Sequence, residues 1–162
     1  MPKQLVLISW MKPAKGWFKA TTDAVVYGRN SCIGVGIILR DHDRLVVGSS
    51  MQKITIILSP NMEKAVALYR GIRFTVDTVL VPAIMESDTK DAIDMVMVGT
   101  APFVDIGVVI SVILALVNHY PIFVVHVPSR QFLKKENLLS GSSKSWYSHA
   151  SKGEDTKLAC LL

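Results

Sequence analysis

The sequence is poor in cysteine, with only Cys32 and Cys160 among 162 residues. Two cysteines so far apart provide neither a metal-binding spacing nor a disulfide framework. Charged residues make up only 19% of the chain and hydrophobic residues 50%, a balance that excludes a disordered protein. We therefore expect one domain with a substantial core. Both cysteines are expected to be reduced thiols in a soluble intracellular protein of the nucleus or cytoplasm.

The sequence also lacks an apolar run long enough to cross a membrane. Residues 106–117 are almost wholly apolar, but Asp105 and Asn118 bound them. A run of that length is typical of a buried helix. The apolar run at 5–10 is too short for a signal-peptide core and has no cleavage site after it. No internal repeat is visible, and we expect a monomer without a membrane partner.

The chain carries a modest excess of positive charge. Eighteen Lys and Arg against thirteen Asp and Glu give a net charge of +5. This balance suits a polyanionic partner without requiring one. The candidates for phosphate contacts do not form a cluster in the sequence: Arg29, Arg40, Arg44, Lys53 and Lys90.

Three β-rich segments open the domain, at 17–26, 32–40 and 45–58. Short polar turns separate them, which predicts an antiparallel meander. In 32–40, aliphatic residues occupy every second position, the pattern of a strand buried mainly on one face. We assign Asp41 and Asp43 to the turn that follows this strand.

A helix is expected to start at Ser59-Pro60, because serine is a good N-cap and proline fits the first helical position. The side chains expected to face the core recur at helical spacing: Met62, Val66, Tyr69, Ile72 and Val76. Glu63 belongs to a neighbouring stripe with the small residues Ala67 and Gly71. Such a stripe allows close approach to a sheet, so Glu63 is expected beside the sheet.

A short strand at 80–85 is followed at once by Asp88 and a helix. Thr89 or Asp88 is expected to cap that helix, with Asp91 in its first turn, Asp94 on its solvated face, and an apolar face made of Ala92, Ile93, Val96 and Met97. After a break at 99–102, a helix at 104–118 and a strand at 122–127 complete the pattern. Asp88 thus ends a strand, where open α/β sheets bind ligands. Taken alone, this position favours a solvated acid at a strand end, and only the rest of the chain favours a ligand-binding role.

Several short segments occur together at characteristic intervals: Trp10-Met11-Lys12-Pro13, Gly16-Trp17-Phe18-Lys19, Thr22-Asp23-Ala24, Gly34-Val35-Gly36, Leu39-Arg40-Asp41, Glu63 with Ala65 and Ala67, Met85-Glu86-Ser87-Asp88, Val104-Asp105-Ile106, and Val125-His126-Val127-Pro128. Their joint spacing is far more specific than any single motif. In this respect the chain resembles the ribonuclease H family. The likeness is greatest to ribonuclease H-like domains of plant proteins related to retrotransposon reverse transcriptases, and it covers roughly residues 10–137.

The resemblance implies an α/β fold of the ribonuclease H-like type. Its mixed five-stranded sheet would have three antiparallel strands followed by two parallel ones, flanked by helices. We assign residues 1–139 to this domain. Residues 140–162 are expected to form a divergent, mobile tail.

The resemblance also implies a set of active-site residues. Asp23, Glu63 and Asp88 match the family's carboxylates, and Glu136, ten residues after His126, occupies the place of a fourth acid that is aspartate in the family. These four would hold Mg²⁺, or Mn²⁺, and His126 would move a proton at the leaving group. The implied activity is metal-dependent endonucleolytic hydrolysis of the RNA strand of RNA–DNA hybrids by a two-metal mechanism. The implied partner is an RNA–DNA hybrid or RNA.

Each candidate also has a structural explanation. Asp23 inside an apolar strand is costly unless it is paired or metal-bound, so its structural explanation is the weakest. Glu63 near a helix N-terminus gains favourable electrostatics, and a strand-end His126 is as often structural as catalytic. Glu136 follows Lys134 and Lys135, and these charged neighbours favour a surface position for it.

Three departures from the family pattern favour an alternative function. Ala24 replaces a glycine, Phe132 replaces an asparagine, and 140–143 interrupts the helix of the fourth acid. The alternative is a catalytically weakened or inactive nucleic-acid-binding module derived from a retroelement. A third hypothesis is a structural remnant of a mobile element that binds nothing specific.

Overall fold

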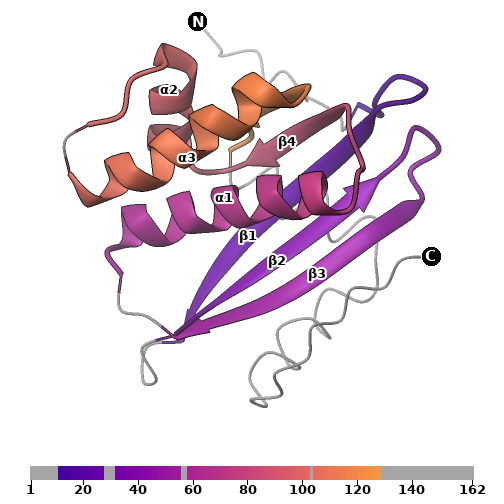
Figure 1. The fold of residues 1–162 in the computed structure, drawn as a ribbon. Coiled ribbons are helices and arrows are strands. Elements are labelled where there is room, and N and C mark those ends of the chain that lie inside the picture. The colour runs from indigo at the N-terminus through magenta and orange to yellow at the C-terminus, as the bar shows by residue number, and fades with distance from the viewer. Residues whose placement is uncertain (1–10, 28–31, 56–57, 103, 129–162) are drawn as a thin grey trace, which may run out of the picture.

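The computed structural model describes residues 11–27, 32–55, 58–102 and 104–128. Within them the elements follow in the order β1 (Phe18–Tyr27), β2 (Cys32–Arg40), β3 (Val46–Thr55), α1 (Pro60–Asp77), β4 (Ala83–Ser87), α2 (Lys90–Val98), α3 (Asp105–His119) and β5 (Ile122–His126) (Figure 1). The predictions for Glu136, Cys160, the helix of the fourth acid and the tail lie outside the described residues.

The strands form one mixed sheet in the order β3-β2-β1-β4-β5. β1 pairs antiparallel with β2, and β2 with β3, whereas β4 pairs parallel with both β1 and β5. This is the sheet that the sequence predicted. Most strand boundaries agree with the predicted ones to within a single residue, and the fourth strand is shifted furthest, because it runs from Ala83 to Ser87 instead of 80–85.

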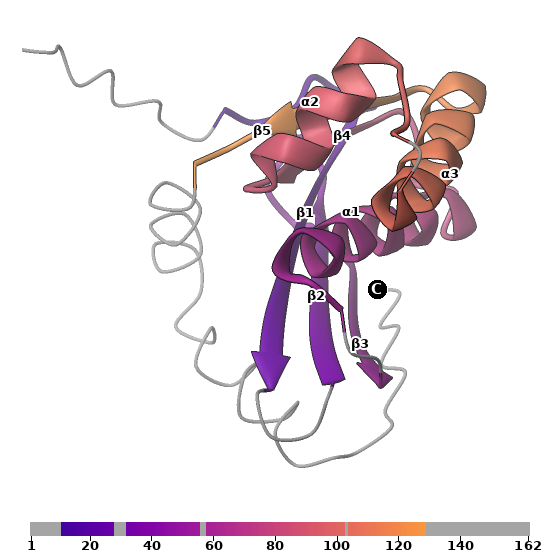
Figure 2. The same cartoon turned by 90° about the vertical axis from the view of Figure 1, so that its left-hand side faces the viewer.

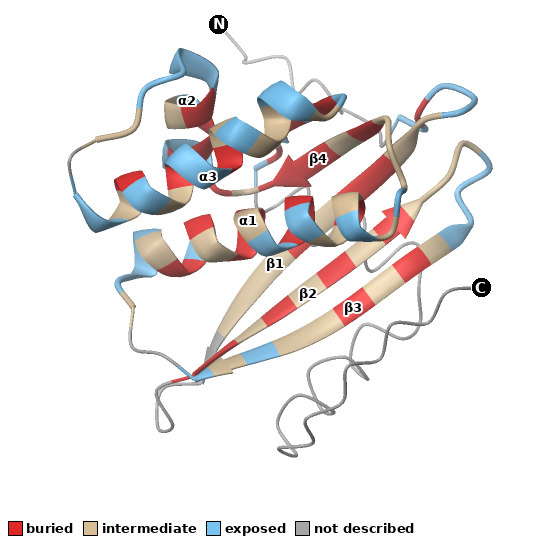
Figure 3. Ribbon diagram, in the orientation of Figure 1, coloured by how far each residue is buried: buried red, intermediate tan, exposed pale blue. Residues whose placement is uncertain are grey.

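The helices α1 and α3 lie side by side, and α1 packs directly on β1 and β2 (Figures 1 and 2). The remaining helix, α2, contacts β5 and α3. Buried residues of all three helices and of the sheet belong to one hydrophobic core. Figure 3 marks the buried residues in red along the ribbon. No helix in the described part of the chain is long and apolar enough to cross a membrane.

The alternation predicted for β2 is confirmed. Its odd-numbered aliphatic residues from Ile33 to Leu39 are at most 1% exposed, whereas the residues between them are only partly buried. The predicted turn between β2 and β3 is also present. Asp41 closes it by accepting hydrogen bonds from the backbone N–H groups of Asp43 and Leu45, at 2.8 and 3.0 Å.

The predicted core face of α1 is confirmed except for Met62. Ile72 is fully buried, and Val66, Tyr69 and Val76 are partly buried against the core, whereas Met62 does not belong to the core cluster. The buried face also includes Ala65, Leu68 and Thr75. The reason is that α1 is covered both by the sheet and by α3, so the buried surface is wider than one stripe and is shifted from the one predicted.

The apolar face of α2 needs a similar correction. Ala92, Ile93 and Val96 are buried as predicted, but Met97 is 71% exposed, because the last turn of α2 extends beyond the core. The N-cap position belongs to Thr89, whose side chain makes no cap hydrogen bond. Its hydroxyl instead accepts a hydrogen bond from Ser87 Oγ at 3.2 Å.

Candidate active site at the end of β4

A small cleft opens where β4 passes into α2. Its volume is about 160 Å³, and it is lined by Asn61, Lys64, Asp88, Thr89, Lys90, Asp91, Ala92 and Ile106. The cleft is therefore built from the first turns of α1 and α2, the residue after β4, and the start of α3. It contains both carboxylates and ammonium groups.

Asp88 is the most enclosed acid of this cleft, with a side chain 18% exposed. Its Oδ2 lies 3.8 Å from Nζ of Lys64, whose side chain is 48% exposed. The second cation, Lys90, binds the carboxylate of Asp94 one turn along α2. That hydrogen bond and the charge of Asp94 raise the pKa of Lys90 above its ordinary value, so Lys90 is a cation at neutral pH.

Glu63 lies in the first turn of α1 and is only 9% exposed. The sequence explains this position, because Ser59 caps the helix and Pro60 starts it. Within the described residues the Glu63 carboxylate has no hydrogen-bond or ion-pair partner. Placing a charged group in such a position costs free energy unless a cation or water compensates it.

Two contacts fix α1 on the sheet next to Glu63. The Thr22 hydroxyl donates a 3.0 Å hydrogen bond to the carbonyl oxygen of Ala67, one turn after Glu63. A further turn along, a Cβ built on Gly71 would lie 3.0 Å from Cβ of Thr22. The predicted stripe of Glu63, Ala67 and Gly71 therefore does face the sheet, and small residues permit the close approach.

Asp23 lies in the second half of β1 and is half-buried. Its Oδ1 accepts a 2.8 Å hydrogen bond from the backbone N–H of Ala24. Thr22 faces α1, so alternation along the strand directs Asp23 toward the opposite face. The pairing of β1 with β4 ends at Thr21 and Glu86, and β4 does not cover the edge of β1 beside Asp23.

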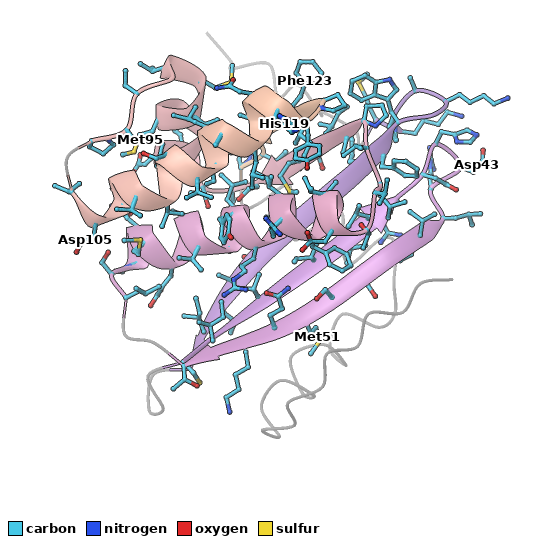
Figure 4. The ribbon with its side chains drawn as sticks, viewed as in Figure 1. Asp43, Met51, Met95, Asp105, His119 and Phe123 are labelled. Carbon is cyan, nitrogen blue, oxygen red and sulfur yellow. The ribbon has the colours of Figure 1, made fainter. Side chains whose placement is uncertain are left out.

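The remaining predicted residues divide into two cases. His126 ends β5, half-buried, and its register partner is Ser87, the residue before Asp88. Glu136 lies outside the described residues. The acids assigned to turns and solvated faces are where they were expected, with Asp43 at the end of the sheet remote from the start of α1 (Figure 4).

The structure brings Glu63 and Asp88 to neighbouring elements, and Lys64, which follows Glu63 in the sequence, contacts Asp88. It does not gather the acids further. Across the described ranges, no group of three or more His, Cys, Asp or Glu side chains is arranged to hold a metal ion.

Comparisons with known proteins identify the architecture. No protein-family model matches the chain, and no curated protein matches it. Among solved structures, ribonuclease H1 from the archaeon Halobacterium salinarum NRC-1 has a TM-score of 0.64 at 17% identity, covering 80% of this chain and 98% of that one. The chain has the ribonuclease H-like fold.

Two further structures with the ribonuclease H-like fold were solved with an RNA/DNA hybrid. LC11 ribonuclease H1 has a TM-score of 0.58 at 16% identity, covering 70% of this chain and 87% of that one. The foamy viral protease-reverse transcriptase has a TM-score of 0.54 at 14% identity, covering 91% of this chain and 22% of that one. At these identities the likeness establishes the fold, and the plant retroelement type stays a prediction.

On this ribonuclease H-like scaffold the donor chemistry suits Mg²⁺, which prefers carboxylate oxygens and retains several waters. Glu63, which is 9% exposed and has no ion-pair or hydrogen-bond partner for its carboxylate among the described residues, would supply one such ligand. Asp88, whose Oδ2 lies 3.8 Å from Nζ of Lys64, would supply another.

Sequence reasoning missed Lys64. The sequence did contain a signal, because Lys64 directly follows Glu63 and places a positive charge near the start of a helix. Its contact with Asp88 depends on how α1 is placed against the end of β4, which no local pattern reveals.

Proposed function

We propose that this domain binds RNA–DNA hybrids and hydrolyses their RNA strand with the help of divalent metal ions. The observation that carries the proposal is Glu63, a carboxylate that is 9% exposed and has no partner within the described residues. An acid in that position gains little from a structural role, because no charged or hydrogen-bonding side chain among the described residues compensates the hydration it loses. A hydrated cation offsets it.

The positions of the other acids support the same proposal. Asp88 follows β4, next to the helix that carries Glu63, and Asp23 lies on the edge of β1 that β4 leaves uncovered. Because alternation along β1 directs Asp23 away from α1, its carboxylate would join those of Glu63 and Asp88 only by reaching around this uncovered edge. When bound, the metal ions would activate the attacking water and stabilise charge on the leaving oxygen.

The remaining roles belong to the chain's own side chains. His126, half-buried beside the residue that precedes Asp88, would hand a proton to the departing oxygen. Glu136 would be the fourth carboxylate. An RNA–DNA hybrid is favoured as substrate because two structures of the same fold, LC11 ribonuclease H1 and the foamy viral protein, were solved with one.

The test is hybrid cleavage by the purified chain with Mg²⁺ or Mn²⁺, compared among variants. Glu63→Gln and Asp88→Asn should each abolish cleavage, and chelation should do the same. Asp91→Asn is the matched control, since Asp91 lines the same cleft but is solvent-exposed in the first turn of α2. Cleavage that survives both Glu63→Gln and Asp88→Asn would contradict the proposal.

A second candidate is hybrid binding without turnover. The contact between Lys64 and Asp88 favours it, together with the lack of a three-acid group within the described residues. Fluorescence anisotropy with a labelled hybrid in chelator separates the two. Tight, salt-dependent binding without cleavage in either metal would establish the binding module.

A further inference from the structure

The contact between Lys64 and Asp88 has an unusual location for an ion pair. Lys64 follows Glu63 in the first turns of α1, near the positive end of the helix dipole, where a cation is disfavoured. Its ammonium nevertheless lies 3.8 Å from Oδ2 of Asp88, and both residues line the cleft. The ammonium of Lys64 therefore contacts the same carboxylate that, under the proposed function, would bind a divalent cation.

We propose that Lys64 is an internal counter-ion of Asp88 that competes with divalent metal and sets the metal affinity of this site. The inference rests on the proposed function. A metal ion that binds Asp88 must displace the ammonium or tolerate its repulsion, and both lower the affinity. Lys64 is half-exposed on a flexible side chain, so displacement requires no rearrangement of the core.

The second lysine of the cleft does not have this role. Lys90 is engaged by Asp94 and lies on the exposed side of α2. It lines the same cleft as Lys64 and has a side chain that is 66% exposed, against 48% for Lys64, but it pairs with a different carboxylate. Lys90 is therefore the matched control for removing a positive charge from the same cleft.

The experiment measures metal binding without substrate, by calorimetric titration with Mg²⁺ and by water-proton relaxation with Mn²⁺. Lys64→Met should tighten binding about three- to tenfold at low ionic strength, because a unit charge near a ligand oxygen is removed. The gain should shrink as salt is added. Lys64→Arg keeps the charge and should bind as weakly as the native chain. Lys90→Met should change the affinity much less than Lys64→Met.

A double-mutant cycle locates the effect. In an Asp88→Asn background, Lys64→Met should lose most of its effect, because its carboxylate partner is gone. If Lys64→Met binds metal no more tightly than the native chain, the inference is wrong. Such a result leaves the proposed function intact as long as the Glu63→Gln and Asp88→Asn variants each bind metal more weakly than the native chain does. If the native chain and Lys64→Met both fail to bind metal, the proposed function fails with the inference.

Discussion

Lys19 and Glu86 form a buried ion pair between β1 and β4. The Lys19 Nζ lies 3.1 Å from Oε1 of Glu86, and the two side chains are 8% and 7% exposed. Lys19 also donates a hydrogen bond to the backbone carbonyl of Met11. The pair joins the two strands that lead to Asp23 and Asp88, so it holds in register the elements of the proposed site.

Glu86→Gln should destabilise the domain by about 3–5 kcal/mol, because it removes the carboxylate charge that lies 3.1 Å from the buried ammonium of Lys19. Urea denaturation at neutral pH measures the change. Replacing both partners by Lys19→Met and Glu86→Leu should restore most of the loss, since an apolar pair needs no compensation. A single Glu86→Gln variant as stable as the native chain would show that the pair contributes little.

Glu63→Gln should stabilise the domain in chelator by roughly 1 kcal/mol, because it removes a nearly buried charge that has no partner in the described residues. Thermal unfolding with and without Mg²⁺ measures this. The native chain should gain stability when Mg²⁺ binds, whereas Glu63→Gln should gain much less. Asp91→Asn, at an exposed helix start, should instead lose a few tenths of a kcal/mol in both conditions.

Gly71→Ala tests the close packing of α1. The new Cβ would lie 3.0 Å from Cβ of Thr22 and 3.2 Å from Sδ of Met85. Overpacking costs about 1–3 kcal/mol, against a helix-propensity gain of about 1 kcal/mol, so a net loss of stability is expected. Arg70→Ala, an exposed neighbour, should change the free energy of unfolding by less than about 0.5 kcal/mol.

Glu136 is the proposed fourth acid, and its side-chain length makes a separate prediction. Hybrid cleavage by the native chain should be weak and should favour Mn²⁺, because a ligand displaced by as little as about 1 Å can lower the rate on the order of a hundredfold. Glu136→Asp should raise the rate and Glu136→Gln should lower it. If neither change alters cleavage with either metal, Glu136 is a surface residue.

The features predicted correctly from sequence follow local rules. The alternation along β2, the start of α1 at Ser59-Pro60 and the end of α2 at Gly99 each depend on residues within a few positions. Gly99 has a φ of 76°, which its lack of a side chain permits. Such patterns determine where the elements begin and end, and hence the order from which the sheet was predicted.

The features that were missed depend on tertiary contacts. The exposure of Met97 reflects where the core ends, not the helical period. The buried position of Glu86 follows from Lys19 on another strand, and the contact of Lys64 with Asp88 follows from the docking of α1. For the same reason the sequence could nominate Asp23, Glu63 and Asp88 but could not give their separations.

The early end of β4 has a consequence for the backbone of β1. Beyond Thr21, β1 pairs with β2 on one side, and no strand among the described residues pairs with its other side. Amide groups around Asp23 that point away from β2 should thus exchange hydrogen with solvent rapidly, although β1 is the middle strand of the sheet. Hydrogen exchange would then mark this edge in the ligand-free chain. If adding an RNA–DNA hybrid slows this exchange, the hybrid binds at this edge, whether or not its RNA strand is cleaved.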